Sequence, residues 1–118
     1  KMNQLTPILV ALGFNALDLC TGFISAVKNK EIQSSKLRDG LFKKVGFMFC
    51  YFLAWIIDNY GAIAGIHLDF LILPIIVFYA CTTELVSILE NISKINSDLL
   101  PEKLMSLFHV SSITKEGE

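Results

Sequence analysis

Three acidic side chains lie well inside long apolar stretches of this sequence, away from their ends, where an acid is energetically costly. Each stretch contains one of them: Asp18 within 5–27, Asp58 within 45–66, and Glu84 within 70–92. At about 1.5 Å of rise per residue, each stretch forms a helix of roughly 33–35 Å, long enough to cross a hydrocarbon core of about 30 Å. An acid at the centre of a bilayer costs roughly 2.5–3.5 kcal/mol or more. We therefore expect these acids to face other helices, other copies of the chain, or water.

Composition and charge support a membrane protein with a defined orientation. Of 118 residues, 53% are hydrophobic and 18% are charged, so the three stretches leave no room for a separate soluble catalytic domain. The positive-inside rule places the basic loop 28–44 in the cytoplasm, with the N-terminus and the link 67–69 outside and the tail 93–118 inside. Basic side chains of this loop are expected to contact lipid headgroups: Lys28, Lys30, Lys36, Arg38, Lys43 and Lys44.

The depth of two acids suggests a shared role. Counted from the cytoplasmic ends of their spans, Asp18 and Glu84 both lie about 12–14 Å into the membrane. The predicted spans place no Lys or Arg at that level, which leaves protonation, hydrogen bonds to Thr or Ser, or contact with water. Two interpretations stay open: a neutral acid bonded across a helix interface, or a group that lines a pore or triggers its opening.

The candidate site consists of polar and small residues within the spans. Gly22 and Ala26 form a small-xxx-small pair that allows helices to approach closely. Thr83 and Ser87 share one face of the third helix beside Glu84. The residues expected to line a pore or a helix interface are Asp18, Gly22, Asp58, Thr83, Glu84 and Ser87.

The ends of the helices are less sharply defined by the pattern. Ser34 or Ser35 can cap a short helix that leads into the second span. The polar triplet 58–60 favours a position at the outer surface, with Asp58 solvated, in which case the span is 41–60 and the segment 61–69 is an outer loop or re-entrant turn.

Two prolines mark expected helix starts in the second half of the chain. Pro74 suits the first turn of the third helix. After it, Pro101 begins a short amphipathic helix, expected on the inner membrane surface or against neighbouring copies.

Other kinds of site find no support in the sequence. The three cysteines, Cys20, Cys50 and Cys81, lie one per span without a C-x-x-C pair, so neither a metal nor another cofactor is expected. His67 and His109 are isolated, and no phosphate-binding loop or nucleophile motif is present, which argues against an enzyme. The basic loop lacks aromatic side chains for stacking, so nucleic acid is not an expected partner.

Several short motifs resemble one known family. They occur in the following order: Asp18, Gly22, Ala26 and Lys28 in the pattern D-x-x-x-G-x-x-x-A-x-K; Ser34-Ser35-Lys36 followed by Gly40 and Lys43-Lys44; Asp58; the run 84–91, which begins with Glu84 and ends with Asn91; and Leu100-Pro101-Glu102-Lys103-Leu104. Their order and spacing over 18–108 resemble the toxin-secretion/phage-lysis holin family. That family assigns no catalytic residue, and none is carried over.

The resemblance implies a function and a set of partners. It implies one all-α domain over residues 1–118, with three transmembrane helices and a short amphipathic C-terminal helix. Such a chain assembles with its own copies in the bacterial membrane and forms lesions through which an endolysin or a large toxin passes. An antiholin is a further possible partner. Two alternatives remain: a small ion-channel or transporter subunit, and an antiholin-type regulator.

Overall fold

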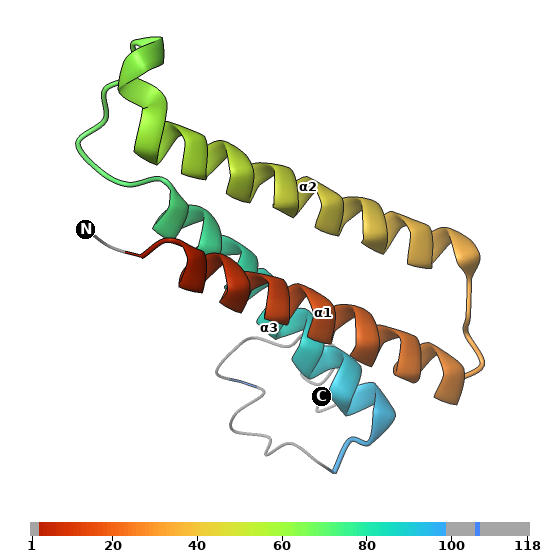
Figure 1. The fold of residues 1–118 in the computed structure, drawn as a ribbon. Helices are drawn as coiled ribbons and strands as arrows, with labels where there is room; N and C mark the ends of the chain where they lie inside the picture. The colour runs from red at the N-terminus through yellow and green to blue at the C-terminus, as the bar shows by residue number, and fades with distance from the viewer. Residues whose placement is uncertain (1–2, 99–105, 107–118) are drawn as a thin grey trace.

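Three long helices make up the described part of the chain. The computed structural model describes residues 3–98 and 106. Helix α1 covers Leu5–Lys28, α2 covers Ser34–Tyr60 and α3 covers Leu73–Ile95, and a short 3₁₀ helix, η1, covers Gly61–Ala64. Helix α2 runs back alongside α1, and α3 then returns in the direction of α1 (Figure 1). The predicted all-α architecture is confirmed for the described residues, while the predicted C-terminal amphipathic helix lies outside them.

Each long helix has the length and apolar character that a membrane crossing requires. The three candidate spans are Leu5–Lys28, Ser34–Ala64 and Leu73–Ile95. The first matches the predicted stretch 5–27 closely. The third begins and ends three residues later than the predicted stretch 70–92. Its start places Pro74 in the first turn of α3, where the missing N–H of proline costs no helical hydrogen bond.

The second helix differs most from the prediction. It begins at Ser34, so the short helix expected from Ser34 or Ser35 is present, but it continues without a break into the second span. The expected serine cap is wrong, because the extended residue Gln33 occupies the cap position and no side chain caps the helix. No proline interrupts the segment 34–44, and Leu37 and Leu41 continue the helical spacing of apolar residues into it. The last basic residue of the predicted loop, Lys44, therefore lies about 15 Å along α2 from its start. The outer end agrees with the shorter alternative, since α2 stops at Tyr60.

Two tight connections set the positions of the helices. The backbone N–H of Glu31 donates to the Ala26 carbonyl at 2.8 Å, and Lys30 has a positive φ of 55°, so the chain reverses within the segment 29–33. After η1, Gly65 adopts a φ of +85°, a conformation that glycine reaches without steric cost.

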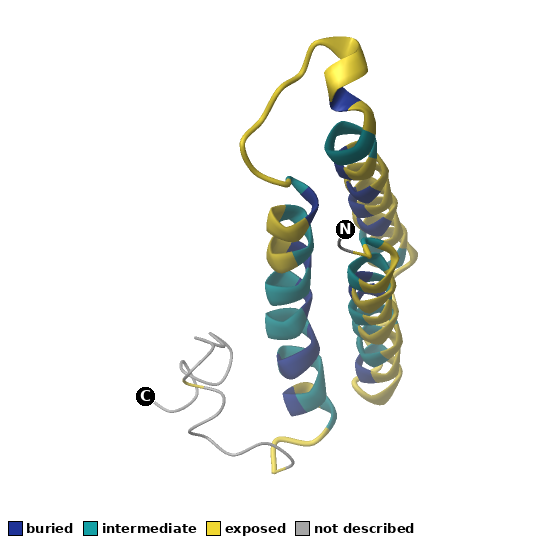
Figure 2. Cartoon of the chain, turned by 60° about the vertical axis from the view of Figure 1, so that its left-hand side comes forward, coloured by how far each residue is buried: buried dark blue, intermediate teal, exposed yellow. Residues whose placement is uncertain are grey.

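The helices turn their buried positions towards one another and their large apolar side chains outwards. Helix α1 packs mainly against α3. The buried core joins α1, α2 and α3 through Ala11, Phe47, Tyr51 and Ala80. Buried positions of α3 face the other two helices in Figure 2. Outward-facing aromatic side chains such as Phe49 and Phe78 are each 70% exposed in the single chain, which suits a surface in contact with lipid.

Candidate functional site

A buried ion pair joins all three helices in the interior. Lys44 Nζ on α2 lies 2.8 Å from Asp18 Oδ2 on α1 and 3.3 Å from Glu84 Oε2 on α3. The side chains of Lys44 and Glu84 are only 6% and 0% exposed. The expectation that no basic residue reaches the depth of the two acids is therefore wrong. The prediction that Lys44 contacts lipid headgroups is also wrong, because the early start of α2 carries this residue into the bundle.

Neutral polar side chains extend the ion pair into a network. Asn15 Nδ2 donates to Glu84 Oε2 at 2.5 Å, and the Tyr51 hydroxyl donates to Asn15 Oδ1 at 2.8 Å. Because Tyr51 occupies the amide oxygen, the amide nitrogen of Asn15 is directed at the carboxyl group. We call the residues Asn15, Asp18, Lys44, Tyr51 and Glu84 the polar cluster.

Asn91, near the C-terminal end of α3, forms a hydrogen bond that joins this end of the helix to the polar cluster. Its Nδ2 lies 3.1 Å from Asp18 Oδ1 and 3.1 Å from Thr21 Oγ1. The side chain passes directly over Gly22, where an added Cβ would lie 3.4 Å from Asn91 Nδ2. The predicted close approach at Gly22 is thus present, and its partner is Asn91.

The charges of the polar cluster are incompletely compensated. Two carboxyl groups share one ammonium, and Glu84 Oε1 is a buried oxygen without a hydrogen-bond partner among the described residues. Taking charges out of water costs several kcal/mol per ion, and the pairing offsets this cost only with good geometry and further hydrogen bonds. The cluster therefore holds the helices in a specific arrangement that is sensitive to the loss of any one member.

Asp58 occupies a separate site at the opposite end of the bundle. Its carboxylate accepts hydrogen bonds from the backbone N–H groups of Ile72 and Leu73 at 2.7 and 2.9 Å, and from Gln4 Nε2 at 3.0 Å. It thereby caps the start of α3 from the end of α2. Asp58 is half-buried at this position, so the prediction of a solvated acid near the end of α2 holds only in part.

The other predicted residues lie around these two sites. Thr83 and Ser87 are half-buried on α3. Lys28 donates to the Ile95 carbonyl and so ties the end of α1 to the end of α3. The remaining predicted headgroup contacts are exposed: Lys30, Lys36, Arg38 and Lys43.

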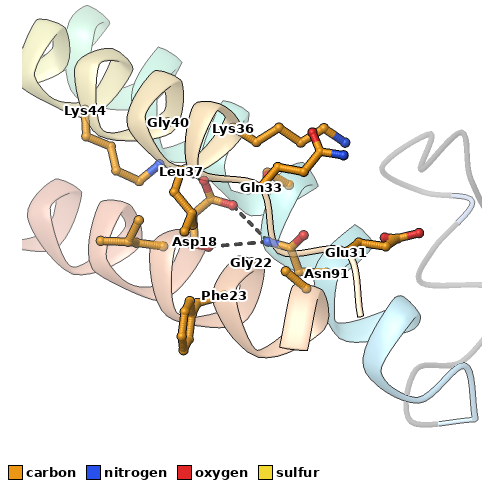
Figure 3. A pocket seen from close by; sticks show the side chains of 13 residues that line it. Asp18, Gly22, Phe23, Glu31, Gln33, Lys36, Leu37, Gly40, Lys44 and Asn91 are labelled. Carbon is orange, nitrogen blue, oxygen red and sulfur yellow. Dashed lines mark hydrogen bonds and ion pairs between the residues drawn. The ribbon is translucent and has the colours of Figure 1, made fainter. Parts of the chain in front are cut away.

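A cleft opens beside the polar cluster, where α1 ends and α2 begins. Its volume is about 350 Å³, and Asp18, Lys44, Ser87 and Asn91 line it together with five residues of the connection and of the start of α2, namely Glu31, Gln33, Lys36, Leu37 and Gly40. Figure 3 shows the side chains of Asp18 and Asn91 meeting beside Gly22. In residues 3–98 and 106, no group of three or more metal-ligating side chains is placed to hold an ion.

Three members of this network are not among the predicted site residues: Asn15, Tyr51, and Asn91, which the resemblance includes only as the end of the run 84–91. A signal for them exists in their spacing. Asn15 lies three residues before Asp18, while Tyr51 and Asn91 each lie seven residues after a charged residue, Lys44 and Glu84 respectively. Polar residues three, four or seven positions apart share a helix face, so each helix presents one polar stripe to the interior.

Comparison with known proteins gives one match. The model of the bacteriophage holin family matches residues 2–111. No curated protein matches the sequence significantly. No solved structure matches the chain significantly either.

Proposed function

Because the chain belongs to the bacteriophage holin family, we propose that it assembles in the cytoplasmic membrane into lesions that release an endolysin or a large toxin. The observation that carries this proposal is the polar cluster inside a bundle whose outer surface is apolar. While such a bundle is closed, its apolar outer surface is compatible with lipid. A water-filled opening requires polar groups along its wall, and the interior of the bundle contains them.

The size of the chain supports assembly from many copies. Three helices cannot surround an opening wide enough for a folded protein, so the wall of such an opening has to come from several chains. In lipid, helices associate through close packing and polar contacts rather than through the hydrophobic effect. In the single chain, the polar contacts of Lys44 and Tyr51 hold α2 against α1 and α3.

These contacts suggest how a resting chain is kept closed. Helix α1 packs mainly against α3, whereas α2 reaches this pair through fewer contacts. In the proposed mechanism, α2 moves away during assembly, and Asp18, Lys44 and Glu84 exchange their internal partners for water or for a neighbouring copy. Timing then depends on the strength of the polar cluster.

The orientation in the membrane is part of the proposal. Exposed basic residues gather where α1 ends and α2 begins, among them Lys30, Lys36 and Arg38, and this end is proposed to face the cytoplasm. The N-terminus then lies outside and α3 ends inside. Cysteines introduced at Asn29 and His67 of a cysteine-free variant should react with an impermeant reagent from opposite sides; labelling of both from one side contradicts the orientation.

Vesicles with the purified chain test the proposed lesions. A small dye and a folded protein are enclosed together, and release of both is expected to rise steeply with the ratio of protein to lipid. Saturable passage of one solute, with the folded protein retained, would instead indicate the channel or transporter alternative.

Lysis timing in cells tests the role of the polar cluster. Asp18→Asn and Glu84→Gln each leave Lys44 with a single carboxylate partner, so α2 is held less firmly and lysis is expected earlier at equal expression. Asp39→Asn, an exposed acid of the same chain, is the matched control. Unchanged timing in both cluster variants would remove the polar cluster from the mechanism.

A further inference from the structure

The cleft beside the polar cluster has charged side chains at its mouth that form no ion pair in the described part of the chain. Its floor is formed by Asp18 and Lys44, which already pair with each other at 2.8 Å. Its mouth is lined by Glu31 and Lys36, one acid and one base, both exposed. Neither of these two forms an ion pair within the described part of the chain, although both face the same cleft. The mouth therefore presents one free charge of each sign.

The first turn of α2 adds to the positive side of the mouth. Gln33 precedes this helix and lines the cleft, yet the helix start has no side-chain cap and no acidic residue in its first turn. Such a start presents unpaired backbone N–H groups and the positive end of the helix dipole. Together with Lys36, it favours an anionic oxygen on this side of the mouth, while Glu31 favours a cation.

The wall of the cleft on α1 is apolar and continues onto the outer surface. Leu19, Phe23 and Ala26 line this wall, and Phe23 is 48% exposed. Beyond it, Ile24 and Val27 are 52% and 48% exposed. A ligand seated in the mouth would thus have an apolar path for alkyl chains along α1.

Two glycines leave the space open. Gly22 and Gly40 both line the cleft, and a Cβ added at Gly40 would meet no atom within 4 Å. The mouth of the cleft lies where α1 ends and α2 begins, the end of the bundle that the proposed orientation places beside the lipid headgroups.

We propose that this cleft binds a glycerophospholipid whose headgroup carries a primary ammonium, as in phosphatidylethanolamine. The phosphate contacts Lys36 and the start of α2, the ammonium donates to Glu31, and one acyl chain follows Phe23. The site goes beyond the proposed function, because a closed single chain contains all of it and its occupation requires no lesion.

Retention of lipids by the purified full-length chain tests the proposal. The chain in detergent micelles is mixed with equal amounts of phosphatidylethanolamine, phosphatidylcholine and phosphatidylglycerol, and retained lipid is measured by native mass spectrometry. Phosphatidylethanolamine is expected to be retained about fivefold more than either of the others, since choline has no N–H donor and glycerol has no cation. Equal retention of the three, or a preference for phosphatidylglycerol, would overturn the proposal.

Matched variants locate the binding. Glu31→Gln is expected to abolish the preference for phosphatidylethanolamine. Lys36→Gln is expected to lower the retention of all three lipids, because each carries the phosphate, and Gly40→Leu is expected to fill the cleft and lower retention as well. Asp39→Asn and Arg38→Gln change exposed charges that do not line the cleft, so both should retain the preference. Equal effects in cleft and control variants would show general surface attraction and overturn the site. Displacement of the lipid by millimolar inorganic phosphate would also overturn it, in favour of a soluble anion.

Discussion

Lys44 is the residue on which the polar interior depends most directly. Its ammonium lies within 3.3 Å of carboxylate oxygens from two different helices, and its side chain is 6% exposed. Removing one partner of a buried pair is far more costly than replacing the whole pair by apolar groups, because a charge is left without compensation. A single substitution at this position should therefore affect all three helices.

Lys44→Met is expected to lower the free energy of unfolding in mixed micelles by about 3–5 kcal/mol, because Asp18 and Glu84 lose their shared cation. Lys43→Met is the matched control, since Lys43 is exposed and contacts the Phe47 ring at 5.9 Å. Its expected loss is below about 1 kcal/mol. Similar losses in the two variants would mean that the ion pair contributes no specific stability.

At the scale of the elements, the most extensive helix packing is between α1 and α3. Gly22 allows it, because Asn91 passes over the glycine and reaches Asp18 and Thr21 with its amide nitrogen. This contact couples the packing of two helices to the polar cluster. A larger side chain at Gly22 would displace Asn91. The packing of α1 against α3 and the hydrogen bonds of Asn91 to the polar cluster would then weaken together.

Gly22→Leu is expected to destabilise the chain by about 1–3 kcal/mol, the usual cost of overpacking. Gly13→Leu is the control on the same helix, because a Cβ at Gly13 would meet no atom within 4 Å. There the higher helix propensity of leucine should leave stability unchanged or increased. The measurement is again unfolding in mixed micelles, and equal destabilisation at both glycines would argue against the close approach of α1 and α3.

Asp58→Ala is expected to cost about 0.5–2 kcal/mol, because the start of α3 loses the carboxylate that accepts from Ile72 and Leu73. Hydrogen exchange at these two amides should become faster. Asp69→Ala, an exposed acid of the neighbouring loop, serves as the control. Unchanged exchange at both amides in the Asp58 variant would show that the cap is not formed.

The elements also show what the sequence can and cannot predict. Hydropathy located all three helices, because a membrane crossing requires a long apolar run whatever its neighbours are. It did not predict that the short helix expected from Ser34 or Ser35 is continuous with the second span, since a basic segment that continues a helix has the same composition as a basic loop. That omission removed Lys44 from the interior and so hid the partner of Asp18 and Glu84. The contact between Gly22 and Asn91 depends on the relative rotation of α1 and α3, which composition does not encode.

At the scale of the whole molecule, the chain joins an apolar outer surface to an ionic interior. Large side chains on all three helices are exposed, including Phe23, Phe49 and Phe78. Such a surface is compatible with lipid around a single chain, and in the proposed assembly other copies would cover part of it. The membership in the bacteriophage holin family and the three candidate spans identify a holin-type membrane protein.

Inducible expression in a bacterium without other holins tests the proposed opening of the membrane most directly. Viability and the release of a cytoplasmic enzyme into the medium are followed after induction, with the amount of the chain in the membrane measured in parallel. The account predicts a sudden loss of viability together with release of the enzyme. A chain that accumulates in the membrane without killing the cell or releasing the enzyme would contradict it, and would point to an antiholin or a selective transporter.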